Sequence, residues 1–348
     1  MDSEFVSFRF RFRKNRLFIL VTLALVFLVT AVIAEVSIRL FAPQESLYPR
    51  YKWSSRYGYS LFPNTQMKAV CPGKYEYTYT INKNGFRGRA VPVSNRYDKT
   101  NILLLGDSNT FGAGVGDSET YAAVMQSRLG DCCNVINLGV PATGLGQQVR
   151  LFYEYGIIYR PEFVVILFCH NDLADNVFMR VTTVEDGRLQ FNDLADMGSL
   201  AVIKKYLSRS IIQKSQLYNF VRFRLFDLLR RKSVAGKTDN RQSDKDILLQ
   251  DIYIELLETF ARDLKTRNTN LVMISVNGQL QEASKLYDFV LDLDGKGLVE
   301  YHEVVEWFME VYRSPDEYSS PEGHPWGVKG HKLVGERLAG VIESRLAP

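Results

Sequence analysis

Residues 102–112 read Ile-Leu-Leu-Leu-Gly-Asp-Ser-Asn-Thr-Phe-Gly, and this stretch decides the fold class. A short apolar run that stops at glycine is typical of a buried strand in a parallel sheet. A serine just past such a strand lies at the carboxyl edge of the sheet, where open α/β folds bind their ligands. Ser108 is therefore a candidate nucleophile. The alternative is that Asp107 and Ser108 only cap the helix that follows.

Strand and helix patterns alternate from residue 101 onward. The expected strands are Ile102–Leu105, Val135–Leu138, Phe163–Phe168, Leu271–Val276 and Asp288–Leu293. The expected helices are Tyr121–Leu129, Gly146–Tyr155, Leu248–Lys265, Val299–Tyr312 and Gly330–Ser344. This alternation predicts an α/β domain over residues 101–346, with a parallel sheet that is covered on both faces.

Residues 173–245 interrupt the alternation and are predicted to form a helical insert. Within it, residues 199–231 mix apolar side chains with lysine and arginine, which favours one or two amphipathic helices. Such a segment packs on the body through its apolar face, or it rests on anionic lipid or covers the functional site. Residues 232–245 are polar, and we expect them to be flexible.

The N-terminus predicts a membrane anchor. Residues 1–16 form a basic tail, and the run Leu17–Ala34 that follows carries no charge. At about 1.5 Å per residue the run covers roughly 27 Å, close to the thickness of a bilayer core. We expect a single span over residues 17–38, with the tail in the cytoplasm and the rest outside the cytoplasmic membrane, in the periplasm or extracellular space. The alternatives are a signal peptide cleaved after Ala34, which would also export the body, and a buried core helix.

Composition bounds the remaining classes. The chain has 348 residues, a hydrophobic share of 46% and a net charge of +4. That share suits a sizeable core, and so slight a charge does not favour a nucleic-acid partner. Residues 39–100 are predicted to connect the anchor to the domain, with an edge strand at Tyr75–Ile81 and a turn at Asn82–Gly85. The sequence leaves the oligomeric state open.

The four cysteines are Cys71, Cys132, Cys133 and Cys169. In an exported chain Cys71 could pair with Cys132 or Cys133, and the spacing does not decide between them. Cys169 ends an apolar run and is expected to be a buried thiol. No Cys or His spacing in the sequence resembles a zinc site.

A nucleophilic serine needs a base, an acid that orients the base, and donors for an oxyanion. Gly139 follows the second predicted strand and presents its backbone N–H to a substrate, or is an ordinary turn glycine. Asn171 follows the third, and its amide is a neutral oxyanion donor or a helix cap. His324 precedes a proline in the loop before the last helix and is the candidate base. His331 is expected to pack or cap a helix, and His302 to lie on a helix surface.

Together these positions resemble the four blocks of the SGNH, or GDSL-type, hydrolases. The matching stretches are Gly106-Asp107-Ser108-Asn109, Gly139, Asn171-Asp172, and His324-Pro325 with Gly330-His331. The stretch Asn84-Gly85-Phe86-Arg87-Gly88 is similar to one that precedes the first block in membrane-anchored bacterial members. The resemblance covers residues 80–345 apart from the insert.

This resemblance implies a flavodoxin-like three-layer α/β/α fold with a parallel five-stranded sheet. It implies Ser108 as nucleophile, His324 as general base, and an oxyanion hole formed by the Ser108 N–H, the Gly139 N–H and the Asn171 side chain. It implies no metal and no organic cofactor.

Two positions depart from the family pattern. Cys169 stands where the third block usually begins with glycine. The family places an aspartate two or three residues before the histidine, and here Glu322 takes the two-residue position and Pro321 the other. Glu322 remains the candidate acid, because the acid orients the imidazole and stabilises its charged form. Asp316 or Glu317 could supply the acid instead, or the serine and histidine act as a dyad.

These residues predict an exported, membrane-anchored serine esterase that acts on acyl esters. Its location suggests carbohydrate esters or lipids of the cell envelope as substrates. O-acyl transfer to an extracellular polysaccharide by the same residues is the second interpretation. A non-catalytic, membrane-anchored scaffold or sugar-binding module is the third.

Overall fold

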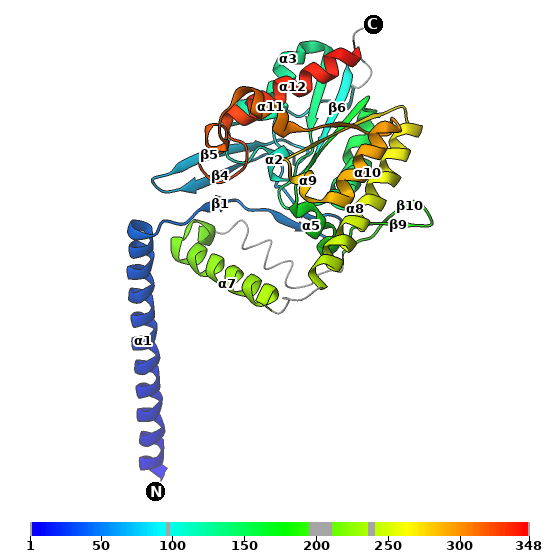
Figure 1. Cartoon of the computed structure of the whole chain (residues 1–348). Helices are drawn as coiled ribbons and strands as arrows, with labels where there is room; N and C mark the ends of the chain where they lie inside the picture. Colours follow the sequence, from blue (N-terminus) through cyan, green and yellow to red (C-terminus); the bar gives the residue numbers. More distant parts are fainter. Residues whose placement is uncertain (1, 95–97, 195–210, 236–240, 347–348) are drawn as a thin grey trace.

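The computed structural model of the chain describes residues 2–94, 98–194, 211–235 and 241–346 (Figure 1). Five parallel strands form the central sheet, in the order β12-β11-β8-β6-β7. They are β6 (Thr100–Leu105), β7 (Cys133–Asn137), β8 (Phe163–Phe168), β11 (Asn270–Ser275) and β12 (Glu300–His302). The predicted α/β class and five-stranded parallel sheet are confirmed.

Helices cover both faces of this sheet (Figure 1). One layer contains α3 (Tyr121–Leu129), α11 (Val304–Val311) and α12 (Val328–Leu346), and the other contains α4 (Leu145–Leu151), α8 (Arg241–Thr266) and α10 (Ser284–Gly295). Side chains alternate along β6, so that Ile102 and Leu104 face the first layer and Leu103 and Leu105 the second. The result is the expected three-layer α/β/α arrangement.

The fifth predicted strand is wrong, because residues 288–293 lie inside α10. Leu286, Val290 and Leu293 are buried at helical spacing along it. The fifth strand is instead β12, which holds His302, a residue that we expected on a helix. The helix begins at Val304, and the side chain of Glu303 caps it by accepting the Val305 N–H.

Residues 42–91 form more than a connector. An antiparallel sheet contains β1 (Ser46–Tyr48), β4 (Thr65–Cys71) and β5 (Tyr75–Ile81), and a second pair contains β2 (Lys52–Ser54) and β3 (Gly58–Ser60). The predicted edge strand is confirmed as β5.

The small sheet β1-β4-β5 packs on the segment that follows Ser108. Met67 and Tyr79 from this sheet share a buried cluster with Phe111 and Ala113. The region that we predicted as a connection is therefore part of the scaffold of the candidate site.

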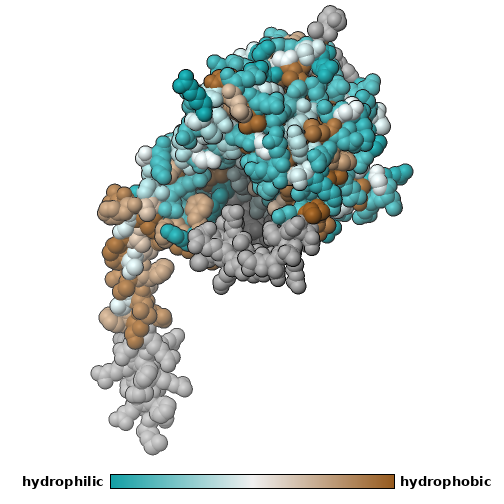
Figure 2. All heavy atoms as spheres, viewed as in Figure 1, coloured by the Kyte–Doolittle hydropathy of each residue, from teal (hydrophilic) through white to brown (hydrophobic). Residues whose placement is uncertain are grey.

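A single long helix, α1 (Asp2–Phe41), leaves the body (Figure 1). Within its residues Leu17–Phe41, the most apolar stretch of 18 residues has a mean hydropathy of 3.0 and is not buried, so this helix is long and apolar enough to cross a membrane. Figure 2 shows apolar side chains gathered on it, whereas the visible face of the body is mostly polar. A signal sequence would share these properties.

The insert contains a hairpin of β9 (Thr182–Glu185) and β10 (Arg188–Phe191), followed by α7 (Gln216–Ala235). In the predicted amphipathic segment, Ile211–Lys214 form a 3₁₀ helix and α7 follows from Gln216, whereas residues 199–210 lie outside the described part. Residues 232–235 and 241–245, expected to be flexible, are the ends of helices α7 and α8. All four cysteines are free, so neither disulfide with Cys71 is formed.

Candidate active site

Ser108 opens α2 (Ser108–Phe111), a single helical turn that starts just after β6. Asp107 is the cap of this turn, because its carboxylate accepts the Asn109 N–H at 3.0 Å. The Ser108 hydroxyl donates to Asp107 Oδ2 at 3.4 Å, which is long for a hydrogen bond. Within the described residues, the Ser108 N–H has no acceptor. This N–H is thus available to an anionic atom at the carboxyl edge of the sheet.

His324 and Glu322 form a pair in the loop before α12. Nδ1 of His324 lies 2.8 Å from Oε1 of Glu322, although the ring N–H is poorly aligned for a hydrogen bond. The side chain of Glu322 is 4% exposed and that of His324 is 31% exposed. The alternative acids Asp316 and Glu317 are exposed, and Glu317 accepts the Arg313 N–H. The structure therefore places Glu322 beside the histidine.

The charge of Glu322 acts on the imidazole of His324. Burial lowers the pKa of His324, but Glu322, helped by Asp107 and Glu45, outweighs that effect and leaves the pKa above its usual 6.5. Among the described contacts there is no hydrogen bond between Ser108 and His324.

Gly114 is where the loops of Ser108 and His324 pack together. A Cβ built on Gly114 would lie 2.3 Å from Ser320 Oγ and 2.9 Å from Glu322 Oε1. The Gly114 N–H donates to the Tyr79 hydroxyl at 3.1 Å. A side chain at position 114 would therefore displace Ser320 or Glu322.

Asn171 begins α5 (Asn171–Met179) just after β8, at the same edge as Ser108. Its Nδ2 donates to Asp107 Oδ2 at 3.3 Å and to Asp175 Oδ2 at 3.1 Å. The amide is therefore held beside the serine turn between two carboxylates. An oxyanion that approached Nδ2 would compete with these two acceptors.

Cys169 lies buried beneath the serine turn, as expected for a free thiol, and is 2% exposed. The Asn109 amide donates to Sγ at 3.1 Å, and the thiol lies 3.4 Å from Asp107 Oδ1. Burial, together with Asp107 and Asp172, raises the pKa of Cys169 well above its usual value, so the sulfur keeps its proton. The thiol of Cys169, at the position where the resemblance leads us to expect glycine, thus contacts the carboxylate of Asp107 in the interior.

Gly139 lies close to the turn that carries Ser108. Its N–H donates to Asn137 Oδ1 at 2.8 Å, and so has a partner inside the protein. A Cβ built on Gly139 would lie 2.5 Å from the Phe111 nitrogen. Glycine here allows β7 and its loop to pass close to α2.

Ala142 is a residue that the sequence reasoning missed. It is exposed, its φ is 60°, and its N–H has no acceptor among the residues that the structure describes. The loop is tied to the serine turn, because the Val140 N–H and the Thr143 hydroxyl lie 3.2 and 3.5 Å from the Gly106 carbonyl oxygen. The sequence signal was Pro141-Ala142-Thr143-Gly144, whose proline and glycine indicate a turn.

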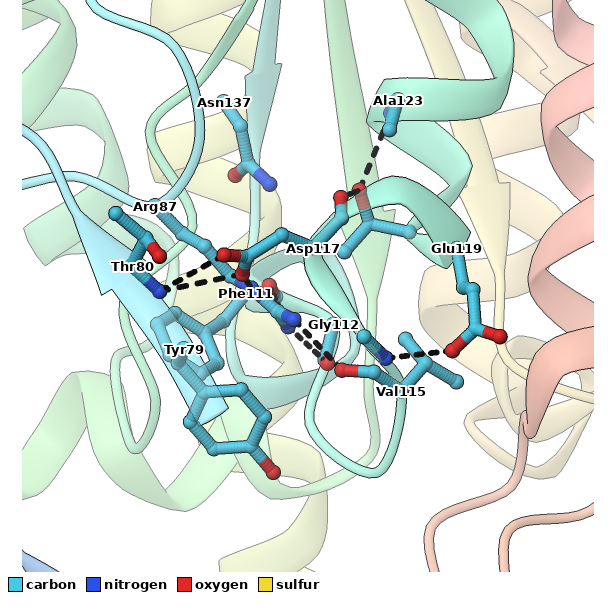
Figure 3. A network of polar contacts seen from close by, with 12 residues as sticks. Tyr79, Thr80, Arg87, Phe111, Gly112, Val115, Asp117, Glu119, Ala123 and Asn137 are labelled. Carbon is cyan, nitrogen blue, oxygen red and sulfur yellow. Dashed lines mark hydrogen bonds and ion pairs between the residues drawn. The ribbon is translucent and has the colours of Figure 1, made fainter. Parts of the chain in front are cut away.

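Arg87 fixes the loop that leaves Ser108 (Figure 3). Its guanidinium donates to the carbonyl oxygens of Phe111 at 3.1 Å, of Val115 at 2.6 Å, and of Gly112. Its Nε pairs with Asp117 at 3.0 Å, and the arginine side chain is 1% exposed. One side chain from the N-terminal region therefore binds three carbonyl groups between residues 111 and 115.

The same arginine is held by β5. Its guanidinium carbon lies 4.4 Å from the centre of the Tyr79 ring, and Asp117 also accepts the Thr80 N–H at 3.1 Å. Burial lowers the pKa of Arg87, and Asp117 opposes that shift. In the sequence analysis Arg87 appeared only as part of the stretch Asn84–Gly88, and no role was predicted for it.

His331 is confirmed as a packing residue. It is fully buried, its Nδ1 accepts the Tyr121 N–H at 3.3 Å, and burial lowers its pKa to about 3. His331 is therefore enclosed by the protein and is not available as the base. Over the described ranges, no group of three or more His, Cys, Asp or Glu side chains is arranged to hold a metal ion.

No protein-family model matches the sequence, and no curated protein matches it. Similar solved structures include a GDSL-like lipase from Bacteroides thetaiotaomicron, 13% identical, with a TM-score of 0.41 over 74% of this chain and 93% of that one.

Two others are a member of the lipolytic protein G-D-S-L family from Veillonella parvula and a catalytic mutant of Axe2, an acetylxylan esterase from Geobacillus stearothermophilus. The first is 8% identical, with a TM-score of 0.40 over 70% of this chain and 98% of that one. The second is 14% identical, with a TM-score of 0.39 over 70% and 93%. These likenesses are distant, so the roles of residues rest on this chain alone.

Proposed function

We propose that the chain is a serine esterase. The pairing of His324 with a nearly buried Glu322, in a loop packed against the serine loop, carries this proposal. Ser108 Oγ attacks the acyl carbonyl while His324 takes its proton, and His324 then gives that proton to the leaving alcohol. Water, deprotonated by His324, attacks the acyl-enzyme and releases the acid and the serine.

The tetrahedral oxyanion needs donors at the same edge of the sheet. We assign this role to the Ser108 N–H and to the Asn171 amide. The third donor in this proposal is the Ala142 N–H, which replaces Gly139 because the Gly139 N–H is bonded to Asn137. An N–H without an internal partner exchanges only a bond to water when it binds the oxyanion, and breaks no hydrogen bond within the protein.

We further propose that α1 anchors the enzyme in the cytoplasmic membrane, with residues 1–16 inside and the catalytic domain outside. Its uncharged length and the basic tail support this topology. An ester of the cell envelope would then be the substrate within reach. The alcohol that receives the acyl group, water or a sugar hydroxyl, separates hydrolysis from transfer.

The test uses the full-length chain purified in detergent with p-nitrophenyl acetate. Wild type should release nitrophenol with a burst and Ser108→Ala should not. Addition of a xylo- or gluco-oligosaccharide should leave the product as free acetate if the enzyme is an esterase. Acetylated sugar as the main product would instead make it a transferase, and equal background rates in both variants would reject both activities.

A further inference from the structure

Glu35, near the end of α1, caps the start of α7. Its Oε1 accepts the Gln216 N–H at 3.0 Å, and its Oε2 accepts the Leu217 N–H and the Ser215 hydroxyl, both at 2.8 Å. A carboxylate is stabilised there, because the first N–H groups of a helix have no partners within it. Arg39 pairs with the same carboxylate at 2.9 Å. The beginning of α7 is thereby fixed to one place on α1.

Two contacts hold this junction from the other side. The Gln44 N–H donates to the Gln216 side chain, and Lys214 Nζ lies 4.5 Å from the centre of the Tyr48 ring. Gln44 and Tyr48 follow α1 closely in the chain. The start of α7 is therefore held both by α1 and by the strand that leads into the body.

The first half of α7 carries an exposed surface that is apolar and basic. Val221 and Leu225, one helical turn apart, are each 54% exposed. Arg224 is exposed as well and Arg222 is half-buried. Exposed aliphatic side chains beside arginines are typical of helices that lie in the headgroup region of a membrane.

The position of α7 along α1 matches that region. The uncharged run of α1 ends at Ala34, one residue before Glu35. If α1 spans a bilayer, Glu35 lies where acyl chains give way to headgroups. From there α7 leads away from α1 at an oblique angle and lies beneath the body, on the side of the body that faces α1 (Figure 1).

We propose that α7 lies in the headgroup layer of the leaflet where α1 ends, and binds anionic lipid. Val221 and Leu225 contact the acyl chains, and Arg222 and Arg224 pair with lipid phosphates. This inference rests on the proposed anchoring by α1. It means that the catalytic body has a fixed height and orientation above the membrane.

The experiment places an environment-sensitive nitrobenzoxadiazole probe on single cysteines of the full-length chain. The background variant is Cys132→Ser, since the other three cysteines are buried. Probe sites are Val221 and Leu225 on α7, Leu25 in the anchor, and Met309, which is 75% exposed on α11 at the far side of the body. Vesicles contain phosphatidylcholine with or without phosphatidylglycerol, and doxyl groups on the acyl chains quench any probe that reaches them.

We expect loss of fluorescence at positions 221, 225 and 25 and none at 309, with a larger loss at 221 and 225 when phosphatidylglycerol is present. Probes at 221 and 225 that behave like 309 while 25 is quenched would overturn the proposal. Failure at 25 as well would reject the anchor itself. Shielding from water without quenching would mean that protein covers α7, which also overturns it.

A pair of charge reversals tests the arginines. Arg222→Glu with Arg224→Glu should abolish the extra quenching caused by phosphatidylglycerol. The control, Lys74→Glu with Lys83→Glu, makes the same charge change at exposed lysines on the body and should keep it. The same loss in both pairs would show a general charge effect and contradict specific binding by α7.

Discussion

The carboxyl edge of the central sheet and the small sheet of β1, β4 and β5 both act on Ser108, in different ways. The edge supplies the groups proposed to react, from Ser108 and Asn171 to the His324–Glu322 pair. The small sheet supplies no such group, but it holds the backbone that follows the serine. Tyr79 of this sheet and Arg87, which follows β5 in the chain, bind that backbone between residues 111 and 115. Chemistry and preorganisation thus come from separate parts of the chain.

The same division concerns Glu322, the proposed acid. The same 112–115 loop that Arg87 binds also packs against Glu322 through Gly114. The longer side chain is therefore held by a surface that the N-terminal region fixes. A loose 112–115 loop would free both the serine turn and the acid.

Ser108→Ala tests the reactive half of the comparison and should have the largest effect. The kcat/KM for p-nitrophenyl acetate should fall by about 10⁵–10⁶-fold, because the acyl-enzyme cannot form. Steady-state kinetics measures the fall, and thermal denaturation should show an unchanged Tm. A loss below tenfold would exclude Ser108 as nucleophile.

Glu322→Gln should reduce kcat/KM by about 10³–10⁴-fold, since the neutral amide no longer stabilises the imidazolium. It should also change the pH profile. His324 must be neutral to accept a proton, so activity falls as the pH drops below its pKa. Because Glu322 raises that pKa, the variant's acid limb should lie at lower pH than that of wild type. Glu317→Gln, at an exposed carboxylate, is the matched control, and an equal shift there would contradict the pairing.

Arg87→Met tests the structural half. The change leaves the carbonyls of Phe111, Gly112 and Val115 without their donor, so we expect the free energy of unfolding to fall by about 3 kcal/mol or more. Urea denaturation measures it. Lys68→Met in the same small sheet removes only an exposed ion pair and should cost less than about 1 kcal/mol. Equal stability of Arg87→Met and wild type would mean that residues 42–91 are a passive connector.

Ala142→Gly should have the smallest effect and the opposite sign. The φ of 60° costs an alanine about 1–2 kcal/mol and a glycine little, so stability should rise slightly, by about 0.5–1 kcal/mol. Activity should be retained, because the backbone N–H is unchanged. Ala123→Gly, inside α3, should instead lower stability by about 1 kcal/mol. A destabilised Ala142→Gly would show that the loop conformation is not strained.

The sequence predicted the edge of the sheet well because strand ends and turns are local patterns. Ser108, Asn171 and His324 each follow or precede a recognisable element, and four of the five strands were located. The strand at Asp288–Leu293 failed, because a short apolar run fits a strand and a buried helix equally. The role of Gly139 stays a prediction. Only the fold shows that its N–H is bonded to Asn137, which is why we propose the Ala142 N–H as a donor instead.

Local sequence patterns could not predict how the small sheet and Arg87 pack on the serine loop. Arg87 lies more than twenty residues before the carbonyls that it binds, and nothing near it in sequence indicates that contact. The same holds for Glu35 and the start of α7, which are separated by about 180 residues. Long-range contacts of this kind are set by the packing of whole elements, which residue spacing does not encode.

Labelling with a fluorophosphonate tests most directly whether Ser108 is an activated nucleophile. The full-length chain in detergent is treated with the probe, digested and examined by peptide mass spectrometry. We expect a covalent adduct on Ser108 in wild type, much slower labelling in Glu322→Gln, and none in Ser108→Ala. Wild-type protein that stays unlabelled, or that carries the adduct on another residue, would contradict the proposed mechanism.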